Sequence, residues 1–170
     1  MIRSILWALG ILGVLLLLQT TLLSYFVIYG TKPDVILVVF VVLATLNGSF
    51  TSQIVGFVIG LALDIVSLSP LGFHAFLFSL AGYLFGLGSG KIYFDPLVIP
   101  ALLGFLATAY YAVGGFLLTF IFHLGDPWSA WFHLGLLIQL LLNVILAPVV
   151  YWLQGWIRER FQNPRRGFGG

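Results

Sequence analysis

An aspartate inside an apolar stretch is the residue of this 170-residue chain with the clearest potential for chemistry. Asp64 precedes Pro70 by six residues, so about 9 Å of helix separates it from the turn that the proline marks. A carboxylate in such surroundings is costly unless it is paired, hydrated or protonated, which makes it a candidate ligand or partner site. The alternative is structural, with Asp64 accepting a hydrogen bond from Ser67 or Ser69 and capping the loop. His74, just past the turn, is a candidate to face the carboxylate.

Enzyme signatures are otherwise weak. The chain has no Cys, and it lacks the HExxH pattern of zinc peptidases. The segment GLGSGK at 86–91 superficially resembles a phosphate-binding loop, but Ile92 stands where that motif needs Ser or Thr. Asp34, Asp95 and Asp126 fall in predicted loops, so no pair of carboxylates converges. We therefore expect no catalytic, cofactor-binding or metal-binding residues, and no enzyme.

Three amide side chains interrupt long apolar runs. Gln139 and Asn143 are four residues apart, which places them on one face of a helix, and Gln19 interrupts the first run. Such residues either form hydrogen bonds between helices or line a cavity for a solute. Interhelical hydrogen bonds are the interpretation that we favour.

Glycines recur at intervals of four on two neighbouring segments. Gly56 and Gly60 share a helix face with Asp64, and a second stripe has the same spacing, comprising Gly82, Gly86 and Gly90. Small residues allow two backbones to approach closely in lipid. The third and fourth predicted helices are therefore expected to pack through these stripes.

Composition indicates the environment of these residues. Hydrophobic residues make up 61% of the chain and charged residues 7%, far below the quarter or so of charged residues in soluble domains. The sequence predicts an all-α integral membrane protein whose single transmembrane domain covers 1–157. A basic tail at 158–170 is expected to be disordered.

About six transmembrane helices account for the apolar runs. The first run is too long for the core of a signal peptide and precedes no cleavage site, so it is taken as a retained span. Asn47-Gly48-Ser49 is a strong turn signal between the second and third spans, which are short and could instead form a re-entrant pair. The predicted spans are 5–29, 35–50, 52–69, 73–90, 97–122 and 129–156.

Positive residues predict the orientation. With six spans, one side of the membrane holds Arg3, Lys91, Arg158, Arg160, Arg165 and Arg166. The other side holds only Lys32. The positive-inside rule therefore predicts that both termini are cytoplasmic. The basic tail could bind anionic lipid headgroups, whereas nucleic-acid binding is not expected of so short a basic patch.

The segment 56–86, GFVIGLALDIVSLSPLGFHAFLFSLAGYLFG, resembles the bacterial rod shape-determining protein MreD family. The family pattern of Gly, Gly, Asp, Ser, Pro-Leu-Gly, Ala and Gly-Tyr matches Gly56, Gly60, Asp64, Ser67, Pro70, Leu71, Gly72, Ala75, Gly82 and Tyr83. Pro33-Asp34 also fits the family. Asp64, Ser67, Pro70, Gly72 and His74 are therefore the functional candidates.

The resemblance implies a non-enzymatic protein of the bacterial inner membrane that acts in elongation of the lateral cell wall. It implies an association with the bitopic protein MreC and, through it, with the glycosyltransferase RodA, its class B transpeptidase and the MreB filament. The family fold is also similar to the S components of energy-coupling-factor transporters. A solute-binding transport subunit is therefore the rival hypothesis, and an intramembrane enzyme is a third, which no pair of catalytic groups supports.

Overall fold

The described part of the chain folds mainly into helices. The computed structural model describes residues 2–21, 31, 33–67, 69–90, 97–132 and 134–162. The helices are α1 (Ile2–Thr21), α2 (Val35–Asn47), α3 (Ser49–Ser67), α4 (Phe73–Gly86), α5 (Val98–Ile121), α6 (Pro127–Trp131) and α7 (Leu134–Gln162). Lys32, Lys91, Asp95, Arg165, Arg166 and the end of the predicted first span lie outside the described residues.

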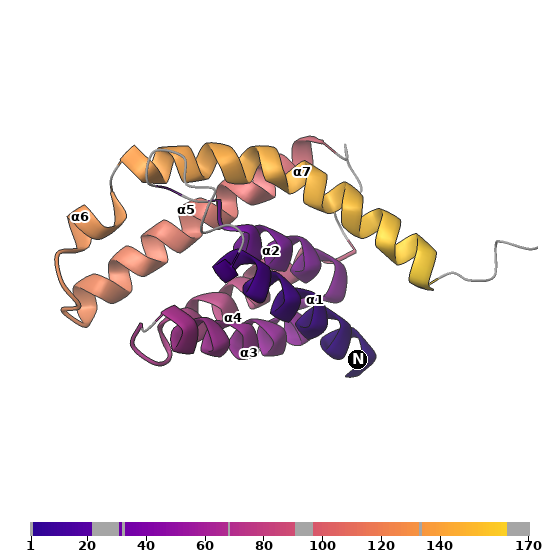
Figure 1. Ribbon diagram of the computed structural model, residues 1–170, viewed down its shortest axis with the longest axis horizontal. Coiled ribbons are helices and arrows are strands. Elements are labelled where there is room, and N and C mark those ends of the chain that lie inside the picture. Colours follow the sequence, from indigo (N-terminus) through magenta and orange to yellow (C-terminus); the bar gives the residue numbers. More distant parts are fainter. Residues whose placement is uncertain are drawn as a thin grey trace, which may run out of the picture.

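The short helix α2 forms the centre of the bundle. Most of its residues are buried, from Ile36 to Val42 without a break and then Ala44 and Thr45. It contacts α1, α3, α4, α5 and α7. In Figure 1, α5 and α7 lie on one side of α2, and α3 and α4 lie on the other. A helix that is surrounded in this way needs no polar face, which explains the unbroken apolar run of its sequence.

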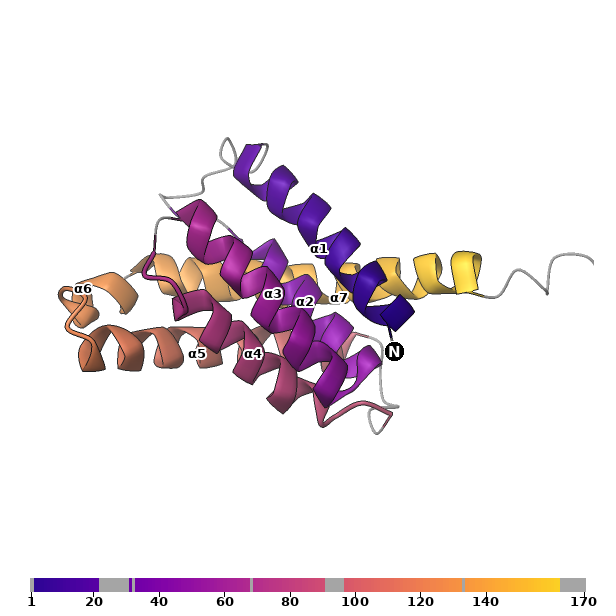
Figure 2. The ribbon, with the colours of Figure 1, turned by 90° about the horizontal axis from the view of Figure 1, so that it is seen from below.

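The ends of the helices alternate between two ends of the bundle. Figure 2 shows the start of α1 and the end of α7 at one end, while α6 lies at the opposite end. Gly48 alone separates α2 from α3, and its positive φ of 83° is readily adopted by glycine. The segment Asn47-Gly48-Ser49 is therefore a turn between two helices.

Three of the helices are long and apolar enough to cross a membrane: α3, α5 and the segment from α6 into α7. The shorter apolar helical segments are Ser4–Gln19 within α1, Val35–Asn47 (α2) and Phe73–Gly86 (α4). At 1.5 Å per residue, the 13 residues of α2 span about 20 Å. The bundle thus combines helices of spanning length with shorter ones that pack against them.

Several predicted boundaries differ from the structure. The fourth span was predicted to reach residue 90, but α4 ends at Gly86 because a series of turns follows it. The predicted last span is interrupted after Trp131, where the separate helix α6 ends. The predicted disorder of the tail from residue 158 is wrong for its first residues, since α7 continues to Gln162.

Candidate functional site

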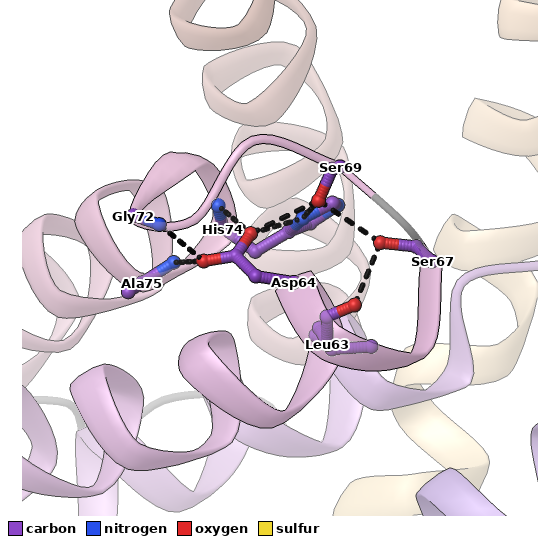
Figure 3. Close-up of polar contacts among 7 residues, drawn as sticks. All are labelled: Leu63, Asp64, Ser67, Ser69, Gly72, His74 and Ala75. Carbon is purple, nitrogen blue, oxygen red and sulfur yellow. Dashed lines mark hydrogen bonds and ion pairs between the residues drawn. The ribbon is translucent and has the colours of Figure 1, made fainter.

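Asp64 caps the start of α4 from the neighbouring helix α3. Its side chain is 1% exposed. Oδ1 accepts hydrogen bonds from the His74 backbone N–H at 2.7 Å and from Ser69 Oγ at 3.1 Å. Oδ2 accepts from the backbone N–H groups of Gly72 at 2.8 Å and Ala75 at 3.3 Å. Figure 3 shows these donors around the carboxylate, with Gly72 and Ala75 on its left and Ser69 on its right.

The local sequence explains why α4 needs an external cap. The first N–H groups of a helix have no partner inside the helix, and a Ser, Thr, Asp or Asn at the N-cap position normally supplies one. Here the N-cap is Gly72, which has a positive φ of 99° and no side chain to offer. A carboxylate at this position also interacts favourably with the positive end of the helix dipole. Asp64 therefore joins α3 to α4 at one end of their hairpin.

The remaining functional candidates surround this carboxylate. His74 Nδ1 lies 2.8 Å from Asp64 Oδ1 and 2.9 Å from Ser69 Oγ. Ser67 Oγ lies 3.0 Å from Ser69 Oγ and donates to the Leu63 carbonyl at 2.6 Å. Ser69 therefore contacts Asp64 directly, and Ser67 reaches it through Ser69.

Pro70 is exposed, and its carbonyl accepts from the Phe73 N–H at 3.1 Å. Together with the bonds to Asp64, this contact gives partners to the amides of the first turn of α4. Both carboxylate oxygens are thus occupied by donors of the chain itself. The geometry favours the capping alternative over a site that is open to a ligand.

A second polar network anchors the start of the central helix α2. Asn143, which is fully buried on α7, accepts from the Asp34 N–H at 3.0 Å and donates to Thr108 Oγ1 at 2.9 Å. Gln19 Oε1 on α1 accepts from the Ile36 N–H at 3.1 Å. Asp34 itself accepts from the Leu37 N–H at 3.0 Å. Gln19 and Asn143 therefore hold the N-terminus of α2 between α1 and α7.

Gln139 differs from the other two amides. It is half-buried on α7, one turn before Asn143, and makes no hydrogen bond within the described part of the chain. Its predicted partner on another helix remains a prediction.

The role of Asp34 was not predicted from the sequence, because an aspartate before an apolar run is an ordinary helix cap. Nothing in the sequence indicates that the side chains of Gln19 and Asn143 lie beside it.

The glycine stripes lie where α3 and α4 approach most closely. A Cβ added at Gly60 would lie 2.6 Å from Ala75 Cα, and one at Gly86 would lie 2.5 Å from Ser49 Cα. Added Cβ atoms at Gly56 and Gly82 would overlap the backbone of Phe78 and Ser52. Helix backbones therefore touch along most of the hairpin, which is the arrangement that small residues permit.

Gly90 does not belong to this contact. It lies beyond the end of α4 with a positive φ of 74°, and an added Cβ would meet nothing within 4 Å. The i, i+4, i+8 spacing predicted a third member of the stripe, but the helix ends before it. Gly90 has a conformational role in the turn instead.

A second close crossing, between α5 and α7, was not predicted from the sequence. A Cβ added at Gly104 would lie 2.7 Å from the Asn143 carbonyl and 3.0 Å from Ala147 Cβ. Thr108 follows Gly104 by four residues and donates to its carbonyl at 2.8 Å. The small residues Gly104 and Thr108 have the spacing of the other stripes, so the same pattern would have revealed this contact.

Helix α6 folds back against α5 through Trp131. The indole N–H donates to Thr119 Oγ1 at 2.9 Å, and the ring packs on Gly115. Asp126 caps α6 by accepting from the N–H groups of Trp128 and Ser129. Hydrogen bonds from Ser129 and Trp128 hold the pKa of the Asp126 carboxyl below its ordinary value of 3.8. The stability that the ionised cap contributes is therefore fully present above pH 3.8, the ordinary pKa. It is lost as the pH falls through the lowered pKa of the folded chain.

The fold and the site define a helical membrane protein whose buried polar side chains join one helix to another. Among the described residues, no group of three or more His, Cys, Asp or Glu side chains is arranged to hold a metal ion. The sequence model of the family described as rod shape-determining protein MreD matches residues 1–156. The chain therefore belongs to the MreD family, as its resemblance predicted, and this implies a role in rod-shape determination. No curated protein and no solved structure gave a significant match.

Proposed function

We propose that this chain is a non-enzymatic membrane scaffold of the bacterial cell-elongation machinery, and that it binds MreC. The family match over residues 1–156 carries the proposal. Through MreC, the chain would connect indirectly to RodA, its class B transpeptidase and the MreB filament. The chain would lie in the inner membrane, with both termini cytoplasmic and the basic tail against anionic lipids.

The hydrogen bonds of the buried polar residues support a scaffold function. Asp64 and Asn143 both bond to backbone N–H groups at the start of another helix. These contacts fix how the helices are arranged, and they leave the carboxylate of Asp64 without a free side for a substrate. A rigid bundle of this kind is suited to presenting a constant surface to a partner protein, because little order has to be gained on binding.

A solute-binding subunit similar to the S component of energy-coupling-factor transporters is the alternative. It was motivated by a buried polar set comprising Asp64, His74, Gln139 and Asn143. Asp64 and His74 belong to the network at the start of α4, and Asn143 belongs to the network at the start of α2. Gln139 joins neither network within the described residues. Since hydrogen bonds within the chain occupy most of their polar groups, we place this alternative second. Binding of a vitamin to the purified chain at sub-micromolar concentration would reverse this order.

The test is affinity purification of the tagged chain from its own cells in mild detergent, followed by mass spectrometry. We expect MreC to be recovered, together with RodA and the transpeptidase. Recovery of a transporter ATPase pair with a coupling subunit would instead identify an S component. Depletion of the chain should also convert rods into spheres, and rods of unchanged shape and width would contradict the scaffold.

A further inference from the structure

Four aromatic rings cluster where the short helix α6 meets the end of α5. Phe116 lies at the centre, with its ring centroid 5.0 Å from that of Trp128, 5.3 Å from Phe132 and 6.3 Å from Phe120. Trp128 and Phe132 also contact each other at 5.7 Å. Phe120, Trp128 and Phe132 are between 48% and 64% exposed. A grouped apolar surface of this kind marks an interaction site.

The two tryptophans of α6 differ in their surroundings. Trp131 is packed inside, where its ring lies on Gly115 and stacks on Phe73 at 6.1 Å, and its indole N–H donates to Thr119 Oγ1. Trp128 is exposed, and its indole N–H has no hydrogen-bond partner among the residues that the structure describes. An apolar ring with an unpaired N–H is suited to the boundary where hydrocarbon meets water.

The position of α6 agrees with such a boundary. Figure 1 places α6 between the end of α5 and the start of α7, at one tip of the bundle. The 24 residues of α5 span about 36 Å, against a hydrocarbon core of about 30 Å. Helix α5 can therefore cross the core and end just beyond it, which brings α6 to the level where lipid headgroups begin.

The aromatic rings lie between an apolar surface and a polar one. Val113, Leu117 and Phe120 are exposed on one face of α5, a helix that is apolar enough to cross a membrane. Three polar residues of the connection from α5 to α6 and of α6 itself are also exposed: His123, Asp126 and Ser129. The rings thus continue a surface that suits acyl chains, and polar groups follow within a few residues. Helices that lie in a membrane interface combine these two features.

We propose that α6 is an interfacial anchor whose exposed rings, Trp128 and Phe132, insert among phospholipids at the boundary between headgroups and acyl chains. The leaflet is the one at the end of α5, which is the outer leaflet under the proposed orientation. Acyl chains cover the rings, while headgroups and water offer acceptors to the Trp128 N–H. Because Trp131 stacks on Phe73 at the start of α4, the anchor also fixes the depth of the α3–α4 pair. This inference does not depend on the binding of MreC.

The test measures fluorescence quenching in phosphatidylcholine vesicles whose acyl chains carry bromine either near the headgroup or near the chain end. The protein for this test keeps Trp128 and Trp131, with Phe in place of Trp7, Trp152 and Trp156. We expect bromine near the headgroup to quench more strongly than bromine near the chain end. Adding Trp128→Phe should remove most of this quenching, since Trp131 is packed inside the bundle. The reciprocal variant, Trp131→Phe, should retain it.

Other patterns of quenching would overturn the anchor. If Trp128 is quenched by aqueous iodide and by neither brominated lipid, α6 projects into water. If bromine near the chain end quenches Trp128 most strongly, the ring lies in the hydrocarbon core and not at its boundary. If Trp128→Phe leaves the quenching unchanged, Trp128 is not the residue that meets lipid.

A protein on this face is tested separately in native membranes, which the absence of Cys in the natural chain allows. A maleimide with a photoreactive group, attached to Trp128→Cys, should crosslink to lipid and to no protein. A crosslink to MreC or to a second copy of this chain would show that protein covers the face, and would overturn the anchor. Either result leaves the scaffold function standing, because recovery of MreC with the natural chain tests that function independently.

Discussion

At the scale of single residues, the carboxylate of Asp64 stabilises the start of a helix to which it does not belong. Replacement by Ala leaves the N–H groups of Gly72, His74 and Ala75 without this acceptor. We expect Asp64→Ala to lower the free energy of unfolding by about 2 kcal/mol, because unsatisfied buried donors are costly. The melting temperature in detergent measures this loss.

Asp64→Asn distinguishes charge from shape at the same position. The amide keeps one acceptor oxygen but turns an NH₂ group toward backbone N–H donors, so we expect a loss of stability and of support for rod shape. Asp126→Asn is the matched control, since Asp126 caps the exposed helix α6. Normal assembly and normal rods with Asp64→Asn would show that the charge is unnecessary.

Asn143 has a comparable role for the central helix. Asn143→Leu removes the acceptor of the Asp34 N–H and the donor to Thr108. We expect destabilisation by about 1–3 kcal/mol, the range for a buried polar group that loses its partner. Gln139→Leu on the same helix face should change the melting temperature much less. Equal effects of the two variants would contradict the assignment of Asn143 as the anchor of α2.

At the scale of helices, the α3–α4 pair depends on direct backbone contact. A Leu side chain at Gly60 would overlap Ala75 and force the two helices apart. The same change at Gly10 on α1 meets nothing within 4 Å of the new Cβ. We expect Gly60→Leu to reduce expression and melting temperature in detergent, and Gly10→Leu to leave both near those of the natural chain. An unaffected Gly60→Leu variant would refute the close packing of α3 on α4.

At the scale of the whole molecule, the proposed orientation can be tested with single cysteines. Leu124→Cys lies between α5 and α6, and Ser89→Cys lies at the other end of the bundle, after α4. We expect a membrane-impermeant maleimide to label Leu124→Cys in intact spheroplasts and to label Ser89→Cys only after permeabilisation. The reverse pattern would invert the orientation, and labelling of both in intact spheroplasts would contradict alternating spans.

Features that depend on composition and local spacing could be predicted from the amino-acid sequence. A chain with 7% charged residues cannot cover a water-exposed surface, so its helical and apolar character is predictable. The regular spacing of Gly56, Gly60, Gly82 and Gly86 indicated a close approach between two helices. The ordered pattern around Asp64 was sufficient for the family resemblance, which the match over residues 1–156 confirms.

Which polar groups become hydrogen-bond partners across the bundle depends on the packing of the helices. Asn143 and Asp34 are 109 residues apart, and no local rule relates them. Gly90 continues the spacing of a stripe, yet the helix ends before it because a turn follows Gly86. The sequence left Asp64 with two interpretations, because a carboxylate beside a turn can serve a ligand or a helix. The fold favours the helix, since it brings backbone donors to both carboxylate oxygens.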